Sequence, residues 1–164
     1  MEKTLQNLKD AFAGESQTNR RYLAFAARAE EEGYPRVARL FRALAAAETV
    51  HAMNFLNALQ VVKSTPENLQ EALAGEMAAF EERYPVMGAT ARQEGHRQAE
   101  QSFTWAQGAE KSHGRLLEKA WKDPKAGLIA DLFVCNLCGY VVEGAPPDTC
   151  PVCQATQPHF RRVD

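Results

Sequence analysis

The chain has no long hydrophobic run and no excess of charge of either sign. Its 164 residues carry 19 Lys and Arg against 21 Asp and Glu, a net charge of −2, without a basic cluster. This balance gives no general attraction to nucleic acid, so no nucleic-acid partner is expected. No apolar stretch approaches the roughly 20 residues that a helix needs to cross a bilayer, and the first residues lack the apolar segment of a secretory signal. We therefore expect a soluble, cytoplasmic protein that binds no membrane.

Cysteine is absent from the chain before position 135. It then appears as two Cys-x-x-Cys pairs, Cys135 with Cys138 and Cys150 with Cys153. In a chain without an export signal, disulfides are the weaker interpretation and a tetrahedral thiolate metal site the stronger one. Two such pairs place four sulfur atoms around one ion without needing a large hydrophobic core.

The character of the sequence changes near residue 122. Before this point the hydrophobic pattern is helical, whereas after it Pro and Gly residues alternate with short apolar runs. We predict a helical domain over residues 1–122, a linker over 123–131, and a loop-rich module with short strands, held by its metal, over 132–164. The predicted fold class is mainly α.

Turn and capping residues divide the helical part into four segments. Helices are expected over about residues 3–32, 35–63, 65–95 and 97–121. Thr65 is expected to cap the third helix, with Pro66 at its first helical position, and Pro85 is expected to kink it.

A Glu-x-x-His motif occurs twice in the helical part, and each copy is preceded by a further Glu on the core stripe of the helix before it. Side chains three positions apart share one face of a helix, so each motif can direct both donors to one metal. One such motif is common on Glu-rich helical surfaces, but two in register, each with another core Glu, favour a carboxylate-bridged two-metal site in a four-helix bundle. Buried carboxylates also need compensating charge, which metal ions supply. The predicted ligands are Glu15, Glu48, His51, Glu76, Glu110 and His113.

The helical part also repeats internally. Phe41 precedes the first motif at the same spacing as Phe103 precedes the second, whereas Glu15 and Glu76 are closer together by one position than the two motifs are. We expect this one-position difference to lie in a connection between helices. The repeat predicts a metal site of approximate two-fold symmetry.

These motifs together resemble the rubrerythrin family over nearly the whole chain. The similar segments are Ala11 to Gln17 around Glu15, both Glu-x-x-His motifs, Gly75-Glu76 followed by Tyr84-Pro85, and the cysteine tail. The tail is similar to a rubredoxin-type iron site, although taken alone it leaves a zinc ribbon as an alternative.

The resemblance implies a ferritin-like four-helix bundle with a C-terminal rubredoxin-like domain, and a non-haem diiron peroxidase that reduces hydrogen peroxide to water. It implies two irons in the bundle, bridged by Glu48 and Glu110, with Glu15 and His51 completing one iron and Glu76 and His113 the other. A third iron, for which zinc can substitute, belongs on Cys135, Cys138, Cys150 and Cys153. Tyr22 and Tyr84 are expected to donate hydrogen bonds to ligand carboxylates, with plain core packing as the alternative, more so for Tyr22.

The resemblance further implies rubredoxin or an NAD(P)H-dependent reductase as electron donor, and a homodimer or higher homo-oligomer in which the module of one subunit serves the two-iron site of another. A linker of about 10 residues spans at most roughly 35 Å, which permits service within a chain as well as between chains. The competing function is ferritin-like ferroxidase or iron handling. The bundle alone leaves it open, and the four-cysteine module argues against it.

Two positions depart from the family pattern. Gln154 stands where a Gly usually follows the second cysteine pair, at a place where positive φ is expected. Ala79 stands where the family usually has a further Glu ligand, so the site is expected to be nearly symmetric.

Overall fold

The computed structural model describes residues 2–125, 127 and 130–163. Positions 126, 128 and 129 of the expected linker, and the terminal residues 1 and 164 of the two expected domains, lie outside the described residues. Contacts divide the chain into two compact units, Met1–Lys63 (unit 1) and Ser64–Asp164 (unit 2). Within the described ranges, no helix is long and apolar enough to cross a membrane.

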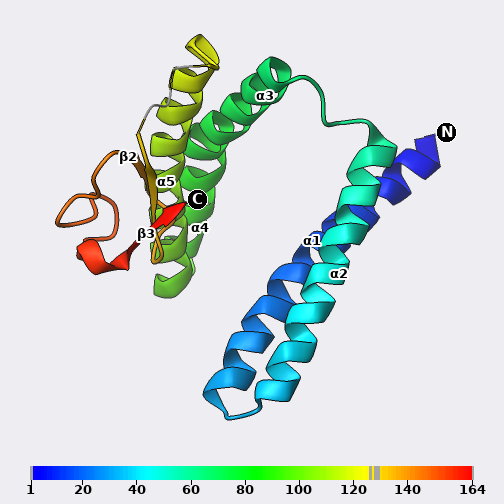
Figure 1. Ribbon diagram of the computed structural model, residues 1–164. Helices are drawn as coiled ribbons and strands as arrows, with labels where there is room; N and C mark the ends of the chain where they lie inside the picture. Colours follow the sequence, from blue (N-terminus) through cyan, green and yellow to red (C-terminus); the bar gives the residue numbers. More distant parts are fainter. Residues whose placement is uncertain (1, 126, 128–129, 164) are drawn as a thin grey trace. The chain divides into compact units, whose positions relative to one another are not determined.

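Unit 1 is a hairpin of two long helices, α1 (Glu2–Glu31) and α2 (Pro35–Leu59) (Figure 1). The tight turn between them uses Gly33 at φ 81°, a conformation that costs glycine little. Pro35 then starts α2, where its missing N–H is not needed. The helix α2 ends at Leu59, earlier than expected, because Gln60 turns into the left-handed region at φ 53°.

Alanine residues form the close contact between α1 and α2. Small side chains at a helix–helix contact let the two backbones approach closely, so few large groups are needed between them. A polar bridge adds to the contact, since the Asn19 amide donates to Ala45 O at 2.6 Å. The buried residues of unit 1 are Ala26, Ala29, Ala38, Ala45 and Ala52.

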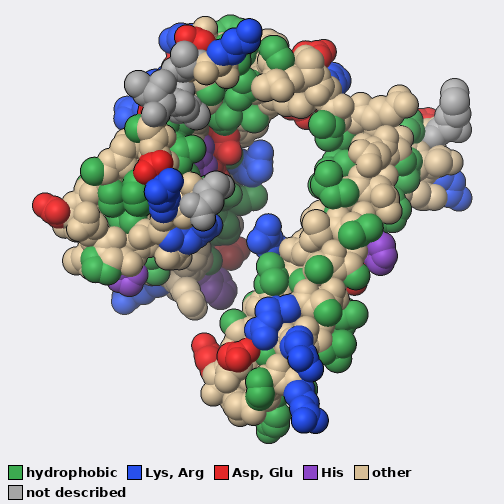
Figure 2. All heavy atoms as spheres, viewed as in Figure 1, with side chains coloured by type: hydrophobic (Ala, Val, Ile, Leu, Met, Phe, Trp, Pro, Cys, Tyr) green, Lys and Arg blue, Asp and Glu red, His purple; other side chains and the backbone are tan. Residues whose placement is uncertain are grey.

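Several large apolar residues of the two helices are exposed in unit 1 taken by itself. Leu5, Val37 and Leu44 expose 49%, 43% and 37% of their surface. The reason is that a pair of helices joined through alanines has no third layer to cover these side chains. Figure 2 shows such hydrophobic side chains at the surface of this hairpin, among the polar ones.

Unit 2 begins with three helical segments that pack along one long helix. The segments are α3 (Thr65–Ala78), the π-helix η1 (Ala79–Arg83) and α4 (Tyr84–Gln93), and the long helix is α5 (Arg97–Lys122). Ser64 rather than Thr65 caps α3, because its backbone N–H donates to the Glu67 carboxylate at 3.1 Å in a capping box. The four expected helices are therefore present, with the third interrupted.

The π-helix accounts for the one-position difference between the two halves of the repeat. The interval from Glu76 to Tyr84 is longer by one residue than the equivalent interval from Glu15 to Tyr22. The longer interval contains η1, and a π-helix absorbs one extra residue within a helix. The expectation that the difference lies in a connection is therefore wrong.

Pro85 explains why the π-helix needs a partner from α5. In a π-helix the carbonyl of Phe80 would accept from residue 85, which is a proline without an N–H. The side-chain amide of Gln107 instead donates to Phe80 O at 3.1 Å. The extra residue also keeps the halves equivalent: the Tyr84 and Phe103 ring centroids are 6.3 Å apart at 32°, and those of Tyr22 and Phe41 are 5.9 Å apart at 31°.

The C-terminal module of unit 2 is a three-stranded antiparallel sheet with the order β2-β1-β3. Its strands are β1 (Leu132–Cys135), β2 (Val141–Glu143) and β3 (Phe160–Val163), and a 3-10 turn, η2 (Gln157–His159), precedes β3. Cys135 pairs with Phe160 in the register of β1 and β3. The module's core is small and consists of Cys135, Cys150 and Ala155, with Tyr140, Val152 and Phe160 packed against it.

Deleting Glu82 tests the role of the π-helix. This residue is exposed within η1, and its removal makes the separation of residues 76 and 84 equal to that of Glu15 and Tyr22. We expect an α-helix with a kink at Pro85, nearly unchanged far-UV circular dichroism and a melting temperature that falls less than in the control variant. Deleting Gln70 within α3 is the control, because an ordinary α-helix cannot absorb a lost residue without rotating one end. A melting temperature that falls equally in both variants would contradict this role.

Candidate metal centres

Unit 1 brings together one Glu from α1 and a Glu and a His from α2. The three donors Glu15, Glu48 and His51 lie with one ligand atom each within 4.8 Å of one another. His51 Nδ1 is 2.8 Å from Glu48 Oε2 and 3.9 Å from Glu15 Oε1. The side chain of Glu48 is only 15% exposed, whereas that of His51 is 53% exposed.

Unit 2 repeats this arrangement with nearly the same distances. Glu76 comes from α3, and Glu110 and His113 come from α5. His113 Nδ1 is 2.7 Å from Glu110 Oε2 and 3.7 Å from Glu76 Oε1. The sequence prediction that each Glu-x-x-His motif meets the Glu of the preceding helix therefore agrees with the geometry of both units. Each of the six donors keeps some exposed surface within its own unit.

His113 has a second partner that the sequence did not indicate. Its Nε2 lies 2.9 Å from the backbone carbonyl of Gly139, in the cysteine module. A carbonyl only accepts hydrogen bonds, so Nε2 carries the proton, and Nδ1 is the atom available to a metal. A hydrogen bond from the second ring nitrogen to a carbonyl is the usual way in which a metal-binding histidine is oriented.

In unit 2, burial and a neighbouring carboxylate perturb the pKa of Glu76. Burial raises the pKa of Glu76 to about 7, and the neighbouring Glu110 adds to this rise through a hydrogen bond and charge repulsion. His113 opposes the shift in the pKa. The metal-free set therefore holds a proton near neutral pH, which a metal ion would displace.

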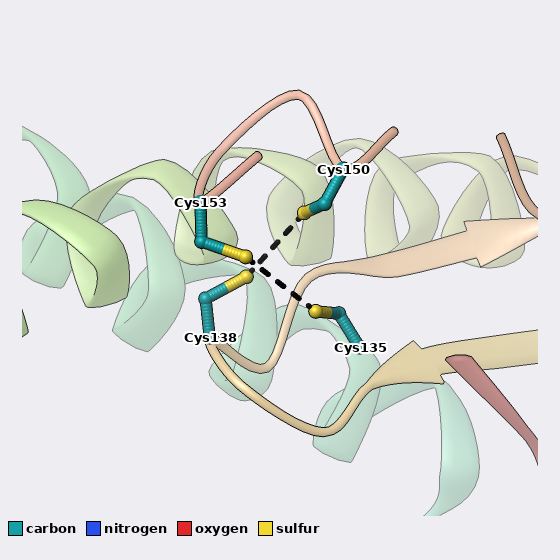
Figure 3. Close-up of side chains that lie close together, drawn as sticks. All are labelled: Cys135, Cys138, Cys150 and Cys153. Atoms are coloured by element: carbon teal, nitrogen blue, oxygen red, sulfur yellow. Dashed lines mark hydrogen bonds between the residues drawn. The ribbon is translucent and has the colours of Figure 1, made fainter. Parts of the chain in front are cut away.

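The four cysteines form a compact cluster at one end of the module (Figure 3). The Sγ atoms of Cys135 and Cys153 are 3.7 Å apart, and those of Cys138 and Cys150 are 3.6 Å apart. A disulfide needs about 2.05 Å, so these are free thiols. A tetrahedron with metal–sulfur bonds of about 2.3 Å has edges of about 3.8 Å. The cluster thus fits one tetrahedral ion.

Burial makes two of these thiols, Cys138 and Cys153, weaker acids than usual. It raises the pKa of Cys138 far above its usual range, and it also raises the pKa of Cys153. Burial acts in the same direction on Cys135, but hydrogen bonds involving the backbone of Cys138 and Leu137 outweigh it and lower the pKa of that thiol. A bound cation is what makes four thiolates stable together.

The two cysteine loops have the same backbone shape. Gly139 N donates to Cys135 O at 2.9 Å, and Gln154 N donates to Cys150 O at 3.0 Å. Gly139 has φ 81° and Gln154 has φ 64°. Gln154 therefore adopts the left-handed conformation that the sequence pattern predicts for this position, although it is not a glycine.

The residues Tyr22, Tyr84 and Ala79 complete the predicted surroundings. Tyr22 packs against Phe41 and Tyr84 against Phe103. Within the described part of each unit, neither hydroxyl bonds to a ligand carboxylate, so the predicted role of the two tyrosines stays a prediction. Ala79 is 4% exposed at the start of η1 and has no donor atom, which leaves three donors in each set.

Comparison with known proteins agrees with both kinds of site. Residues 6–121 match the family described as Rubrerythrin, and residues 133–161 match the rubredoxin-like domain of rubrerythrin. The chain belongs to the rubrerythrin family.

Individual relatives match over almost the full chain. Rubrerythrin-2 of Clostridium acetobutylicum is 34% identical over 96% of this chain and 95% of its own length. Nigerythrin of Nitratidesulfovibrio vulgaris is 34% identical over 92% of this chain and 81% of its own length. A solved structure of nigerythrin in a partially reduced state has a TM-score of 0.60 at 32% identity, and covers 98% of this chain and 86% of that one.

Membership of the rubrerythrins confirms the predicted fold class, a ferritin-like helical domain followed by a rubredoxin-like module. It also confirms the predicted cofactors, two irons in the helical part and one at the four cysteines. The protein is therefore a diiron oxidoreductase. The domain boundaries and the assignment of individual ligands stay predictions.

Gln154→Gly should stabilise the cysteine module. A non-glycine residue in the left-handed region costs about 1 kcal/mol, which glycine avoids. We expect slower release of the metal to a chelator and a higher melting temperature of the module. Gly139→Ala is the matched control, because an added Cβ at Gly139 meets nothing within 4 Å, so only the backbone cost applies. That variant should release metal faster, and equal release rates in both variants would refute the strain at Gln154.

Glu76→Gln should change how the stability of the metal-free protein depends on pH. The pKa of Glu76 is raised from 4.5 to about 7 in the folded state. Its contribution to stability is therefore complete below about pH 4.5 and is lost as the pH rises through about 7. Gln stays neutral at every pH. The free energy of unfolding of the variant, relative to that of the wild type, should therefore rise by on the order of 1 kcal/mol from pH 5 to pH 8, after allowance for solvent screening.

Urea unfolding at both pH values with chelator present measures this difference. The exposed Glu71 on α3 provides the control variant, Glu71→Gln. A constant difference between Glu76→Gln and the wild type across this range would contradict the shift.

Proposed function

We propose that this rubrerythrin reduces hydrogen peroxide to water, with electrons that pass through the rubredoxin-like iron centre. The observation that carries the proposal is the co-occurrence of two kinds of site in one chain. Two matching Glu/Glu/His sets provide oxygen and nitrogen donors, and a four-thiolate cluster lies in the same unit as one of them. Iron storage needs only the first kind, whereas a peroxidase that turns over needs a supply of single electrons.

The donors suit two irons held by both sets together. We propose that Glu48 and Glu110 bridge the metals, that Glu15 and His51 complete one iron, and that Glu76 and His113 complete the other. The proposed bridging carboxylates are the least exposed of the four, at 15% and 17%. Bound there, two ferrous ions would supply the two electrons that O–O cleavage needs, so that no radical would be released.

The side chains of the two sets prepare the site for this chemistry. Four carboxylates offset the charge of two divalent ions, and each Nδ1 faces carboxylate oxygens within its own set. We propose that Tyr22 and Tyr84, which pack against phenylalanines of the neighbouring helix, supply hydroxyl hydrogen bonds to ligand carboxylates once the site is complete. They would fix the orientation of the carboxylates without binding metal.

The remaining parts of the proposal concern partners. The physiological reductant is rubredoxin or an NAD(P)H-dependent reductase, because the thiolate centre carries one electron at a time and has to be reloaded. The protein works as a homodimer or higher homo-oligomer in the cytoplasm.

Cys138→Ser separates peroxide reduction from simple iron oxidation. No cysteine lies in the helices, so the variant should keep its two irons and its helical circular dichroism while losing the absorption of the thiolate iron. Steady-state consumption of peroxide with reduced rubredoxin should fall to about a hundredth or less of the wild-type rate. A single oxidation of the pre-reduced site by peroxide should stay fast.

Iron analysis and a single control complete the experiment. Wild-type protein should hold three irons per chain, two at the helical donors and one at the four cysteines. The variant should hold only the two irons at the helical donors. Ser102 is exposed on α5 and, within the described residues, hydrogen bonds only to Gln98 O of its own helix, so Ser102→Cys should leave the iron content at its wild-type value. Undiminished steady-state peroxidase activity in Cys138→Ser would contradict the proposed electron route. Fast oxidation of ferrous iron by dioxygen, with no peroxidase activity in the wild type, would favour the ferroxidase alternative.

A further inference from the structure

Each donor set lies on the same helix face as an open apolar groove. On α2 of unit 1, Val37 and Phe41 precede Glu48 at helical spacing, so the three side chains share one face. Val37 and Phe41 line a groove of about 450 Å³ together with Phe25 of α1. Within the described part of unit 1, no third helix covers this face. The face that carries the donors therefore needs a partner surface.

Unit 2 has a groove at the equivalent place. It measures about 400 Å³, and its lining residues Met87, Ala99 and Phe103 follow those of unit 1 at the spacing of the internal repeat. Ala99 and Phe103 again share one face of their helix, α5, with Glu110. The two units thus present the same kind of surface, with groove and donors in the same order. Two such faces can cover each other about a two-fold axis, which also brings two donor sets together.

The connection between the units decides which copies of these faces can meet. A ferritin-like bundle joins its two helix pairs by one long crossover connection, because the second pair starts at the opposite end of the bundle from the end of the first. In this chain only residues 60–64 lie between α2 and α3. Both ends of the connection are defined, since Gln60 ends α2 in the left-handed region and Ser64 caps α3.

This connection is too short to cross a bundle. From the helical rise, Glu48 lies about 16 Å from the end of α2, and Glu76 lies about 16 Å from the start of α3. With both donor sets at one level, a crossover therefore has to cover about 30 Å along the bundle. A fully extended chain from Leu59 to Thr65 reaches at most roughly 22 Å. One chain cannot bring its own two donor sets into one ferritin-like site without unwinding the ends of α2 or α3.

We propose that two copies of this chain exchange helix pairs, so that unit 1 of each copy closes a bundle with unit 2 of the other. The inference rests on one part of the proposed function, namely that both kinds of donor set together hold one pair of irons. Reciprocal exchange closes two bundles in a dimer, covers all four grooves and requires no connection to cross a bundle. Each two-iron site then takes three ligands from either chain: Glu15, Glu48 and His51 from one, and Glu76, Glu110 and His113 from the other.

The first test counts iron pairs in mixed dimers and does not depend on activity. Two differently tagged full-length chains are co-expressed, and dimers that contain one of each are isolated by successive affinity steps. One chain carries Glu48→Ala with His51→Ala, and the other carries Glu110→Ala with His113→Ala. Exchange places both altered sets in one site and both intact sets in the other, so Mössbauer spectroscopy should find one spin-coupled iron pair per dimer. Closure of each chain on itself leaves an altered set in every site and predicts no pair.

The reciprocal mixture should give the opposite result. It combines an unaltered chain with a chain that carries all four substitutions. Exchange then predicts no iron pair, whereas closure of each chain on itself predicts one pair per dimer. A dimer of two unaltered but differently tagged chains is the control and should hold two pairs. The iron of the four cysteines gives a separate, uncoupled spectrum and reports that each chain is present and loaded.

The second test lengthens the connection. A flexible segment of about 12 Gly and Ser residues between Val62 and Lys63 adds roughly 40 Å of reach. Each chain can then close on itself, because the two units of one chain meet at a high effective concentration. We expect the results of the two mixtures to change places. The same segment between Pro124 and Lys125 is the control and should leave both results as they are without an insertion.

Light scattering provides a reading that needs no altered ligand. The unaltered protein should be a dimer, and the variant with the longer connection should gain a monomeric form that holds an iron pair. A monomer of the unaltered protein that holds an iron pair would overturn the exchange, and assemblies without a fixed size would overturn its reciprocal form. One pair in the reciprocal mixture and none in the first would also overturn the exchange, and would leave peroxide reduction standing. Absence of iron pairs from the unaltered protein would instead overturn the proposed function.

Discussion

The gathering of carboxylates at partly buried positions is the constraint on which the rest of this structure depends. Each unit holds two Glu and one His with ligand atoms within 4.8 Å, and the helices of unit 1 meet through alanines. Without metal, burial and the neighbouring Glu110 raise the pKa of Glu76 in unit 2 to about 7. A metal ion offsets the negative charge of these carboxylates. Metal binding is therefore favoured, because the metal-free carboxylates are unfavourable in this position. The four thiols of the module likewise need a bound cation before all of them can be thiolates, and sulfur is a softer ligand than a carboxylate oxygen.

Features that depend on local spacing were predictable from the sequence. Helical geometry places residues three apart on one face, so both Glu-x-x-His motifs could be paired with Glu15 and Glu76 from the pattern alone. The two Cys-x-x-Cys pairs likewise indicated their cluster. For both kinds of motif, a few neighbouring residues and one rule of geometry were sufficient. The positive φ of Gln154 was expected instead from the resemblance of the cysteine tail to rubredoxin-type loops.

Features that depend on competition between interactions were not predictable in this way. The sequence pattern could not show that alanines, rather than larger apolar residues, form the contact between the two helices of unit 1. Both kinds of residue recur with the same helical period. The position of the extra residue depended on Pro85, which cannot donate to Phe80 O. It also depended on Gln107, far along the chain, whose side-chain amide donates to that carbonyl instead. The fit of Val152 against Gly108 joins segments with no common pattern. Such contacts arise from tertiary packing, which a single sequence does not encode in any periodicity.

The two histidines differ in how freely their rings can turn. His113 is held at both nitrogens, by Glu110 on one side and by Gly139 on the other, so rotation about its Cβ–Cγ bond breaks two hydrogen bonds at once. His51 is held only through Nδ1 within the described part of unit 1, and its side chain is 53% exposed. A ring tethered at one point can swing away from a ligand position and return, whereas a ring tethered at two points cannot. The repeat is thus symmetric in its donors and asymmetric in their mobility, with the stiffer histidine on the side of the thiolate cluster.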